Sequence, residues 1–255
     1  MPKYPTKHKY GWKNSLPDQR DYQYSASYEI LQALPQVVDL RSKCPPVLDQ
    51  LNLGSCVSNA VAGGLQFLQM KEQIASFVAS RLYIYYNGRL LEGTVNSDSG
   101  LSVRDGIKSV NQYGFPPETD WPYDISQFTV HPPSQAYGDA NRNRILRYQR
   151  IQQNIMQMLG CLASGYIFLV GFTVYQSFES NDVALTGVVP MPHFGEQVLG
   201  GHCVEIVGYS VILRTFIFKN SWGSDWGDKG YGYLPFASLQ DPNLSSDFWA
   251  IDLVS

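Results

Sequence analysis

The sequence predicts an α+β protein in which a mainly helical half precedes a half rich in antiparallel strands. Apolar residues recur at helical spacing after residue 56, whereas apolar, strand-like runs dominate from about residue 143. A charged content of only 16%, together with 22 Gly, 15 Pro and 17 Tyr, is typical of an irregular fold with short strands. We expect two lobes, because a chain of 255 residues can bury a substantial core.

Residues 1–36 are expected to form an arm rather than a domain of their own. They carry five tyrosines and a turn-rich run from Leu16 to Tyr22. A segment this short cannot bury a core by itself, so it must lie on the rest of the chain or stay disordered. Residues 37–145 and 146–255 would then be the two lobes.

The first lobe is expected to be helical. Apolar residues follow helical spacing from Val57 to Ile74, with the weak helix formers Gly63-Gly64 as the one internal interruption. A second helix is predicted from Leu101 to Tyr113, with Gly114 as its C-cap. The first helix would begin at Cys56, where the helix dipole favours a thiolate over a thiol.

The second lobe combines one helix with several short strands. The helix is predicted over Ile151–Ala163. Apolar runs typical of strands follow at 166–172, 203–211, 215–219, 231–236 and 248–254. This succession predicts a sheet rich in antiparallel strands.

The composition excludes several classes of partner. A net charge of −3 gives no clustered Lys and Arg for binding nucleic acid or an anionic membrane. No stretch approaches the roughly eighteen apolar residues of a membrane span. We expect no metal and no cofactor, and the sequence makes no prediction of oligomeric state.

Three separated segments carry side chains that suit nucleophilic catalysis. Gln50 precedes Cys56 by six residues, and this thiol follows a Gly-Ser pair. His202 stands at the head of an apolar strand, and Asn220 is followed two residues later by Trp222. A lone cysteine is more often a small buried hydrophobe than a nucleophile, so the inference depends on the three segments occurring together.

At these positions the chain resembles the papain family of cysteine proteases. The resemblance spans about residues 37–255 and is most specific over 219–231, which reads KNSWGSDWGDKGY. The segments Gly200-Gly201-His202 and Gly171–Tyr175 look more like the cathepsin B branch than like papain. The resemblance implies a papain-like two-lobe fold, in which a helical lobe and an antiparallel, β-barrel-like lobe enclose an active-site cleft.

The resemblance also implies catalytic roles. Cys56 would attack a peptide carbonyl as a thiolate, and the imidazolium of His202 would stabilise the thiolate and then protonate the leaving amine. Asn220 would orient the imidazole, while the side chain of Gln50 and the backbone amide of Cys56 would form the oxyanion hole. The substrate would be a peptide or a protein.

Further residues are implied to contact the substrate. Ser99-Gly100 resembles the glycine-containing edge whose backbone pairs with an extended substrate. Leu101, Gly171 and Cys203 are expected to line the pocket for the side chain two residues before the scissile bond, although a core role would explain Leu101 and Gly171 equally well. Trp222 would shield the hydrogen bond between the catalytic amide and imidazole from water.

The resemblance leaves two interpretations of the arm. The family places an inhibitory propeptide before the mature start, which Val37–Arg41 resembles, but a permanent structural extension explains the arm equally well. The stretch from Tyr123 to Tyr148 is too short for the occluding loop of cathepsin B, which favours an endopeptidase.

The cysteines bear on the compartment. Four occur, at positions 44, 56, 161 and 203. If Cys56 and Cys203 line an active site, the other two have no obvious partner spacing, so no structural disulfide is expected. The chain start has no apolar signal segment, and absent disulfides are typical of a reducing compartment such as the cytoplasm.

Two other functions stay open. A catalytically silent binding module could share the fold and hold the arm or a partner peptide in its cleft, although Gln50, Cys56, His202 and Asn220 are all retained. An acyl transferase could also use a Cys-His pair, but such enzymes normally complete the triad with Asp.

Overall fold

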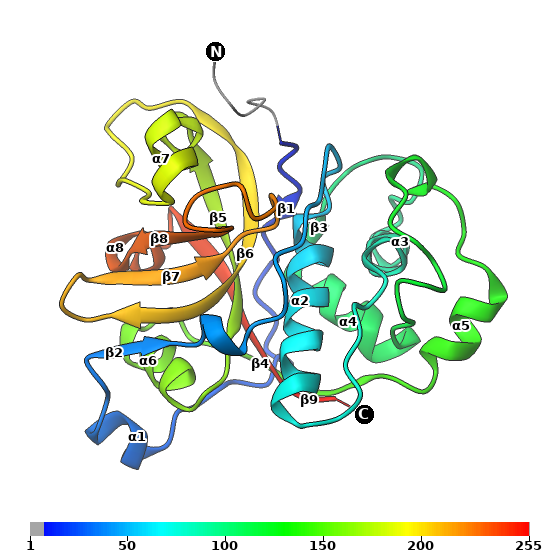
Figure 1. The fold of residues 1–255 in the computed structure, drawn as a ribbon, viewed down its shortest axis with the longest axis horizontal. Coiled ribbons are helices and arrows are strands. Elements are labelled where there is room, and N and C mark those ends of the chain that lie inside the picture. The colour runs from blue at the N-terminus through cyan, green and yellow to red at the C-terminus, as the bar shows by residue number, and fades with distance from the viewer. Residues whose placement is uncertain (1–7, 255) are drawn as a thin grey trace.

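The computed structural model describes residues 8–254, and its elements form the α+β fold that the sequence predicts. A seven-stranded antiparallel sheet has the order β4-β9-β5-β6-β7-β8, with β2 paired to β6 (Figure 1). Its strands are β2 (Val37–Asp39), β4 (Ile145–Arg150), β5 (Phe168–Tyr175), β6 (Val198–Ser210), β7 (Thr215–Lys219), β8 (Tyr231–Pro235) and β9 (Ser245–Val254).

The helices divide between the two halves. Figure 1 shows α2 (Cys56–Lys71) standing between the sheet and a group made of α3 (Arg81–Leu91), α4 (Val103–Tyr113) and α5 (Ser134–Ala140). The remaining helices accompany the strands: α1 (Tyr28–Gln32), α6 (Ile155–Ala163), α7 (Asn181–Thr186) and α8 (Phe236–Gln240). Because α2 contacts β6 on one side and α3 and α4 on the other, it is buried nearly all round.

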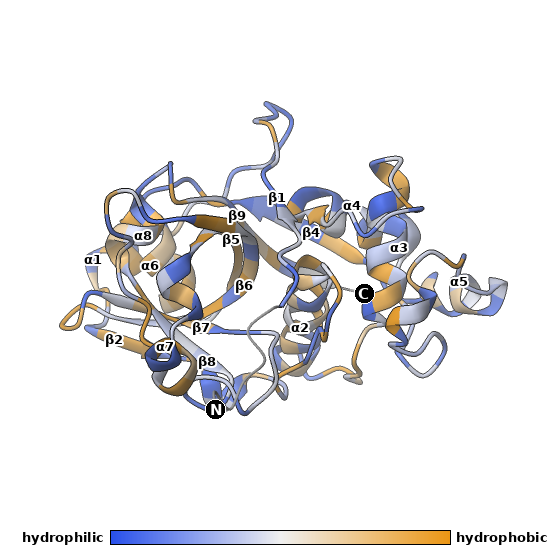
Figure 2. Cartoon of the chain, turned by 90° about the horizontal axis from the view of Figure 1, so that it is seen from above, coloured by the Kyte–Doolittle hydropathy of each residue, from blue (hydrophilic) through white to orange (hydrophobic). Residues whose placement is uncertain are grey.

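Alternating residues of the central strands serve two apolar cores. On β5, Phe168 and Val170 enter the core of the β-rich half, while Leu169 enters the core around α2. On β9, Trp249 likewise faces α2, and its neighbour Phe248 faces the opposite way. Successive side chains of a strand point to opposite faces, so a strand covered on both sides is apolar throughout. Figure 2 shows this apolar character in β5, β6 and β9.

Element boundaries differ from the predictions where local hydrogen bonds decide them. The helix expected from residue 151 begins at Ile155, because the side chain of Asn154 accepts from the amide of Met156 and caps it. The helix expected from Leu101 begins two residues later, since Leu101 and Ser102 form a short strand, β3. Gly114 ends this helix with φ +75°, as predicted.

The structure describes residues 8–36 of the arm: the first part runs along the boundary between the two halves of the fold, and α1 then lies beside α6 of the β-rich half (Figure 1). Strand β1 (Trp12–Lys13) pairs in parallel with β3 (Leu101–Ser102). Further along, Tyr24 N donates to Arg150 O at 2.8 Å, and Arg150 N donates to Tyr22 O at 2.7 Å. The arm therefore lies on the body of the protein, and residues 1–7 of the expected arm fall outside the described residues.

The four cysteines are free. Within residues 8–254 no helix combines the length and the apolar content that crossing a membrane requires.

A buried ion pair fixes how α2 packs on the sheet. Lys219 Nζ lies 3.1 Å from Glu205 Oε1, and both side chains are almost fully enclosed. A Cβ on Gly63 of α2 would lie 2.2 Å from Glu205 Oε1. The adjacent Gly64 has ordinary room, because its Cβ would meet Leu169 Cδ2 at 3.7 Å.

We predict that Gly63→Ala destabilises the protein and that Gly64→Ala does not. Alanine gains about 1 kcal/mol of helix propensity at either position. At residue 63 it must also push a buried carboxylate off Lys219, which costs about 3 kcal/mol. Urea unfolding should show that the free energy of unfolding falls by about 2 kcal/mol in Gly63→Ala. In the matched control, Gly64→Ala, it should rise by up to about 1 kcal/mol. Equal effects would contradict this account of the packing.

Candidate active site

Cys56 occupies the first position of α2. Ser55 precedes it at the N-cap, and the Ser55 hydroxyl lies 2.5 Å from the hydroxyl of Tyr123. The thiol is fully buried with the arm in place. Backbone groups of Gly11 from the arm and of Cys203 from β6 lie near the thiol and act to lower its pKa. The expected nucleophile thus stands at a helix N-terminus, in contact with the sheet and with the arm.

Gln50 is fixed by four side-chain hydrogen bonds. Its Oε1 accepts from Ser221 Oγ at 2.8 Å and from Trp222 Nε1 at 3.2 Å. Its Nε2 donates to Leu53 O at 2.9 Å and to Lys9 O, a carbonyl of the arm, at 3.0 Å. The Trp222 indole N–H can only donate, so the side-chain atom of Gln50 that it contacts must be the oxygen. The amide nitrogen of Gln50 is therefore the atom that donates to the arm carbonyl.

His202 and Asn220 form the second part of the site. His202 Nε2 and Asn220 Oδ1 are 2.8 Å apart, and Ser221 N donates to the same oxygen at 2.8 Å. The backbone amide of Ser221 can only donate, so it identifies this atom of Asn220 as the side-chain oxygen. An oxygen accepts, so Nε2 of His202 must carry the proton. Within residues 8–254 the buried Nδ1 of His202 has no hydrogen-bond partner, which leaves its lone pair free for chemistry.

Trp222 covers this pair of side chains. Its ring lies against the imidazole of His202, with centroids 4.9 Å apart. On the arm, His8 stacks on Trp222 at 4.1 Å with an interplanar angle of 11°. Trp222 therefore packs on the imidazole that Asn220 holds, and it also offers a flat surface to His8 of the arm.

Burial beneath the arm disfavours charge on both catalytic candidates. Burial raises the pKa of the Cys56 thiol to about 11, although the backbone hydrogen bonds oppose this shift. Burial likewise lowers the pKa of His202 to about 4, although the hydrogen bond that its Nε2 donates to Asn220 Oδ1 acts in the opposite direction. Burial beneath the arm therefore disfavours the charged thiolate–imidazolium pair that is expected from the sequence.

The arm fills the cleft with four consecutive residues. Lys9 presents its carbonyl to Gln50, and Tyr10 packs edge-on against His202 with centroids 6.2 Å apart. Gly11 lies at the thiol and accepts from Leu101 N at 2.7 Å. Trp12 follows and lies against Gly171 and Gly201, where a Cβ would collide with its indole.

The predicted substrate-binding residues have distinct surroundings. Gly100 is approached by the arm, since a Cβ on it would lie 2.1 Å from Gly11 O. Leu101 offers its backbone to the arm, but its side chain is buried beneath Gly88. Ser99 instead donates to Thr94 Oγ1 at 2.8 Å. Gly171 and Cys203 are paired neighbours on β5 and β6, so Gly171 borders the indole and Cys203 borders the thiol.

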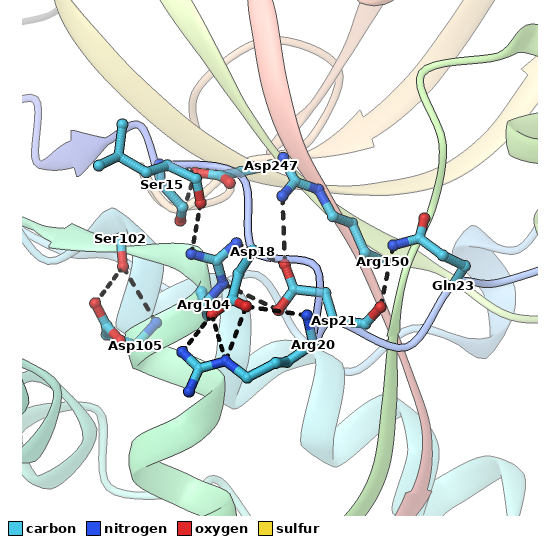
Figure 3. Close-up of polar contacts among 11 residues, drawn as sticks. Ser15, Asp18, Arg20, Asp21, Gln23, Ser102, Arg104, Asp105, Arg150 and Asp247 are labelled. Atoms are coloured by element: carbon cyan, nitrogen blue, oxygen red, sulfur yellow. Dashed lines mark hydrogen bonds and ion pairs between the residues drawn. The ribbon is translucent and has the colours of Figure 1, made fainter.

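Two acidic residues that contact the arm were missed by the sequence analysis. Tyr10 donates its hydroxyl to Glu179, and Trp12 Nε1 donates to Asp247 at 3.2 Å. Ser15 adds two hydrogen bonds to Asp247, and Figure 3 shows Ser15 beside Asp247. No motif marks either acid. The sequence analysis also did not predict that Trp12 contacts the cleft. Its large aromatic side chain in a mainly polar segment was the one signal that could have indicated this.

Within residues 8–254 no cluster of three or more His, Cys, Asp or Glu side chains could hold a metal ion. The arrangement instead combines a thiol, an imidazole of fixed tautomer and an amide donor aimed at a carbonyl oxygen. These are the groups that acyl transfer through a covalent thioester requires.

Comparisons with known proteins all point to the same family. The model of the papain family cysteine protease matches residues 34–240. A peptidase C1-like protein of Acanthamoeba polyphaga mimivirus is 38% identical over 96% of this chain and 87% of its own length. Peptidase 1 of Euroglyphus maynei is 27% identical, and the match covers 79% of this chain but only 61% of that protein.

Solved structures agree with this result. Xylellain, a cysteine protease from Xylella fastidiosa, is 38% identical, covers 99% of both chains and has a TM-score of 0.91. Digestive procathepsin L 3 of Tenebrio molitor has the same fold at 18% identity, with a TM-score of 0.71 over 91% of this chain and 74% of that one. The chain therefore belongs to the papain family of cysteine proteases and is a hydrolase of the cysteine peptidase class.

Proposed function

We propose that the chain is an endopeptidase in which Cys56, His202, Asn220 and Gln50 act together and the arm is an inhibitor in cis. One observation carries the proposal: the Gln50 amide donates to the Lys9 carbonyl beside a thiol and an imidazole whose Nδ1 is free. A carbonyl held there has the environment that a scissile carbonyl needs.

The proposed reaction begins when the cleft opens. Cys56 transfers its proton to His202, and the thiolate attacks the peptide carbonyl carbon, so that a C–S bond forms and the oxygen gains negative charge. Gln50 and the Cys56 amide donate to that oxygen. The C–N bond then breaks as the imidazolium gives its proton to the leaving amine. Water attacks the thioester with His202 as base, which releases the acid product and restores the thiol.

Displacement of the arm would convert the site to its reactive form. A neutral thiol with a neutral imidazole holds the same number of protons as the ion pair, so the balance depends on solvation rather than on bulk pH. Tyr10 and Gly11 exclude water from both groups. Their departure would remove the burial that now disfavours the two charges.

The direction of the arm explains how it can occupy the cleft without being a substrate. In a substrate the residue in the side-chain pocket comes before the carbonyl that is attacked. In the arm, Trp12 comes after the Lys9 carbonyl that Gln50 holds, and β1 runs parallel to β3. The chain therefore lies in the reverse sense, and its carbonyl is held without the geometry for attack.

The course of the arm also favours endopeptidase activity. Its residues extend past the thiol in both directions, from His8 on Trp222 to Trp12 beside Leu101. A cleft that holds a continuous chain across the nucleophile can hold the middle of a long substrate. An exopeptidase, in contrast, needs a cleft that is closed at one end, next to the nucleophile.

We predict that Cys56→Ala abolishes peptide hydrolysis, whereas Asn220→Ala reduces kcat on the order of a hundredfold and leaves measurable activity. The thiolate makes the bond, while the amide only fixes the imidazole, and a hundredfold corresponds to about 2.7 kcal/mol. The half-buried thiol of Cys44 provides the control, since Cys44→Ala should leave kcat unchanged. Complete loss in both Cys56→Ala and Asn220→Ala would contradict the division of roles. Added amine should not divert the acyl group, as it would in a transferase.

We predict that Trp12→Ala activates the full-length protein. Removing the partly buried indole should cost about 2 kcal/mol of docking free energy, on the order of thirtyfold in the docking equilibrium. A docked arm competes with substrate, so KM for a short peptide should fall by about tenfold or more while kcat stays constant. Tyr22→Ala removes an arm aromatic that is 78% exposed and should leave KM unchanged. An unchanged KM for Trp12→Ala would leave the arm as a structural extension.

A further inference from the structure

A chain of hydrogen bonds joins two backbone segments that border the site. Asp98 Oδ1 accepts from Gly54 N at 3.1 Å and from the hydroxyl of Tyr85 on α3 at 2.5 Å. That hydroxyl in turn accepts from Gly100 N at 3.1 Å. Gly54 stands two residues before Cys56, and Gly100 stands directly before β3. One phenol and one carboxylate therefore connect the loop of the candidate nucleophile to the edge where the arm lies.

The links of this chain are enclosed by the protein. Tyr85 is fully buried, the side chain of Asp98 is only 11% exposed, and Gly54 and Gly100 are buried as well. Burial raises the pKa of the Tyr85 hydroxyl, and its bond to Asp98 acts in the same direction. The phenol therefore keeps its proton and donates it to the carboxylate. A hydrogen bond to an ionised group is roughly twice as strong as a neutral one.

The turn at Gly100 depends on this bond. Its φ is +72°, and glycine adopts positive and negative φ about equally readily, so the residue does not select the turn by itself. The bond from its amide to Tyr85 selects it instead. The next residue, Leu101, donates its amide to Gly11 O at 2.7 Å. The direction of this donor, which faces the chain in the cleft, follows from the turn before it.

Helix α3 also holds the earlier part of the same loop. Arg89, which is fully buried and one turn after Tyr85, donates from Nη1 to Val95 O at 2.9 Å and to Ser97 O at 2.7 Å. The path of the loop is thus fixed before it reaches the turn. Removal of the Tyr85 hydroxyl would release Gly100 and not the whole loop.

A substrate would meet the same donor. The arm runs parallel to β3, in the reverse sense to a substrate, so a substrate would run antiparallel to β3. Opposite Leu101, in the place of Trp12, it would carry the residue two positions before the scissile bond. Residues that form a hydrogen-bonded pair in an antiparallel ladder exchange both backbone bonds. The Leu101 amide would therefore donate to the carbonyl of that substrate residue.

We propose that Tyr85 and Asp98 are positioning residues that aim the Leu101 amide at the substrate backbone, an inference that rests on the peptidase activity proposed above. They act through Gly100 and Gly54 and not on the reacting atoms. Without the phenol oxygen, the buried Gly100 amide would lose its acceptor. A buried unpaired amide is costly, so the turn would rotate toward another partner and carry the Leu101 amide away from the cleft.

The test uses the full-length protein and two fluorogenic amides that share Arg before the scissile bond. One is a blocked dipeptide with Leu at the preceding position, and the other is Arg alone with a free amino group. Only the dipeptide offers a carbonyl to Leu101. The readout is the ratio of kcat/KM for the dipeptide to kcat/KM for the single residue. Competition from the arm affects both substrates equally, so it cancels in this ratio.

Tyr85→Phe removes only the hydroxyl and should lower the ratio about tenfold, as expected for one misdirected backbone hydrogen bond. Asp98→Asn keeps the shape of the side chain but removes its charge, and it should lower the ratio in the same direction. It also weakens the contact with Lys9 of the arm, at 2.9 Å, which cancels in the ratio. The double variant should fall no further than Tyr85→Phe, because the two residues act in one chain.

Tyr83→Phe is the matched control. Tyr83 is a second buried tyrosine of α3, and its hydroxyl donates to Tyr113 O at the end of α4, at 3.1 Å. Its loss should leave the ratio unchanged. Hydrogen exchange gives a second readout that needs no activity. The Gly100 amide should exchange about tenfold faster or more in Tyr85→Phe and at the wild-type rate in Tyr83→Phe.

The outcomes separate the two proposals. The positioning role is overturned, and the peptidase activity stands, if Tyr85→Phe and Asp98→Asn both leave the ratio at the wild-type value. The same holds if Tyr83→Phe lowers the ratio as much as Tyr85→Phe, or if Gly100 exchange is unaltered in Tyr85→Phe. If neither substrate is hydrolysed, including by Trp12→Ala, the peptidase activity is overturned and the positioning role with it.

Discussion

The main chain of the arm passes so close to the walls of the cleft that only glycine can stand at the point of contact. A Cβ on Gly11 would lie 1.8 Å from Gly54 O, and one on Gly100 would lie 2.1 Å from Gly11 O. This approach lets the backbone of the arm contact the thiol, the amide of Leu101 and the amide of Gln50 together. The burial that disfavours charge on both catalytic candidates follows from the same contact.

A second interaction holds the part of the arm that follows the cleft-contacting residues in the sequence. The carboxylate of Asp21 lies 2.6 Å from Arg104 Nη2 of α4 and 3.4 Å from Arg150 Nη1 of β4, so it joins the helical half to the sheet (Figure 3). Arg104 also donates to Leu16 O at 2.7 Å. Asp21 and Arg104 are nearly buried, whereas the pair between Asp18 and Arg20 is exposed at its arginine and should contribute little. The arm thus has a rear part fixed across both halves and a front part that occupies the cleft.

The sequence predicted most of what local patterns control. Helix α2 and the end of α4 were predicted, because each depends on residues that are close in the sequence. These are the helical spacing of apolar residues after Cys56 and the Gly114 cap. The three segments with Gln50, Cys56, His202 and Asn220 were recognised because their order and spacing resemble a known family. Helix α3 was missed, since its tyrosines and buried Arg89 do not produce an obvious apolar stripe.

Features that depend on distant contacts could not be predicted in the same way. Asp247 lies in a segment that looks like an ordinary strand, and its left-handed conformation arises from the register of β9 against β5. The path of Trp12 depends on glycines at positions 171 and 201, which are far from it in sequence. Composition indicated only that the arm could pack on a surface, because no local rule says which surface that is.

Hydrogen exchange of the full-length protein, before and after a peptidyl inhibitor labels Cys56, tests the two-part arm most directly. The account predicts that amides of residues 8–15 lose protection when the inhibitor takes their place. Residues 22–26 should keep theirs, because Tyr24 is bonded to Arg150 and Asp21 to both arginines. Protection of residues 8–15 that survives labelling, or protection lost along the whole arm, would contradict it.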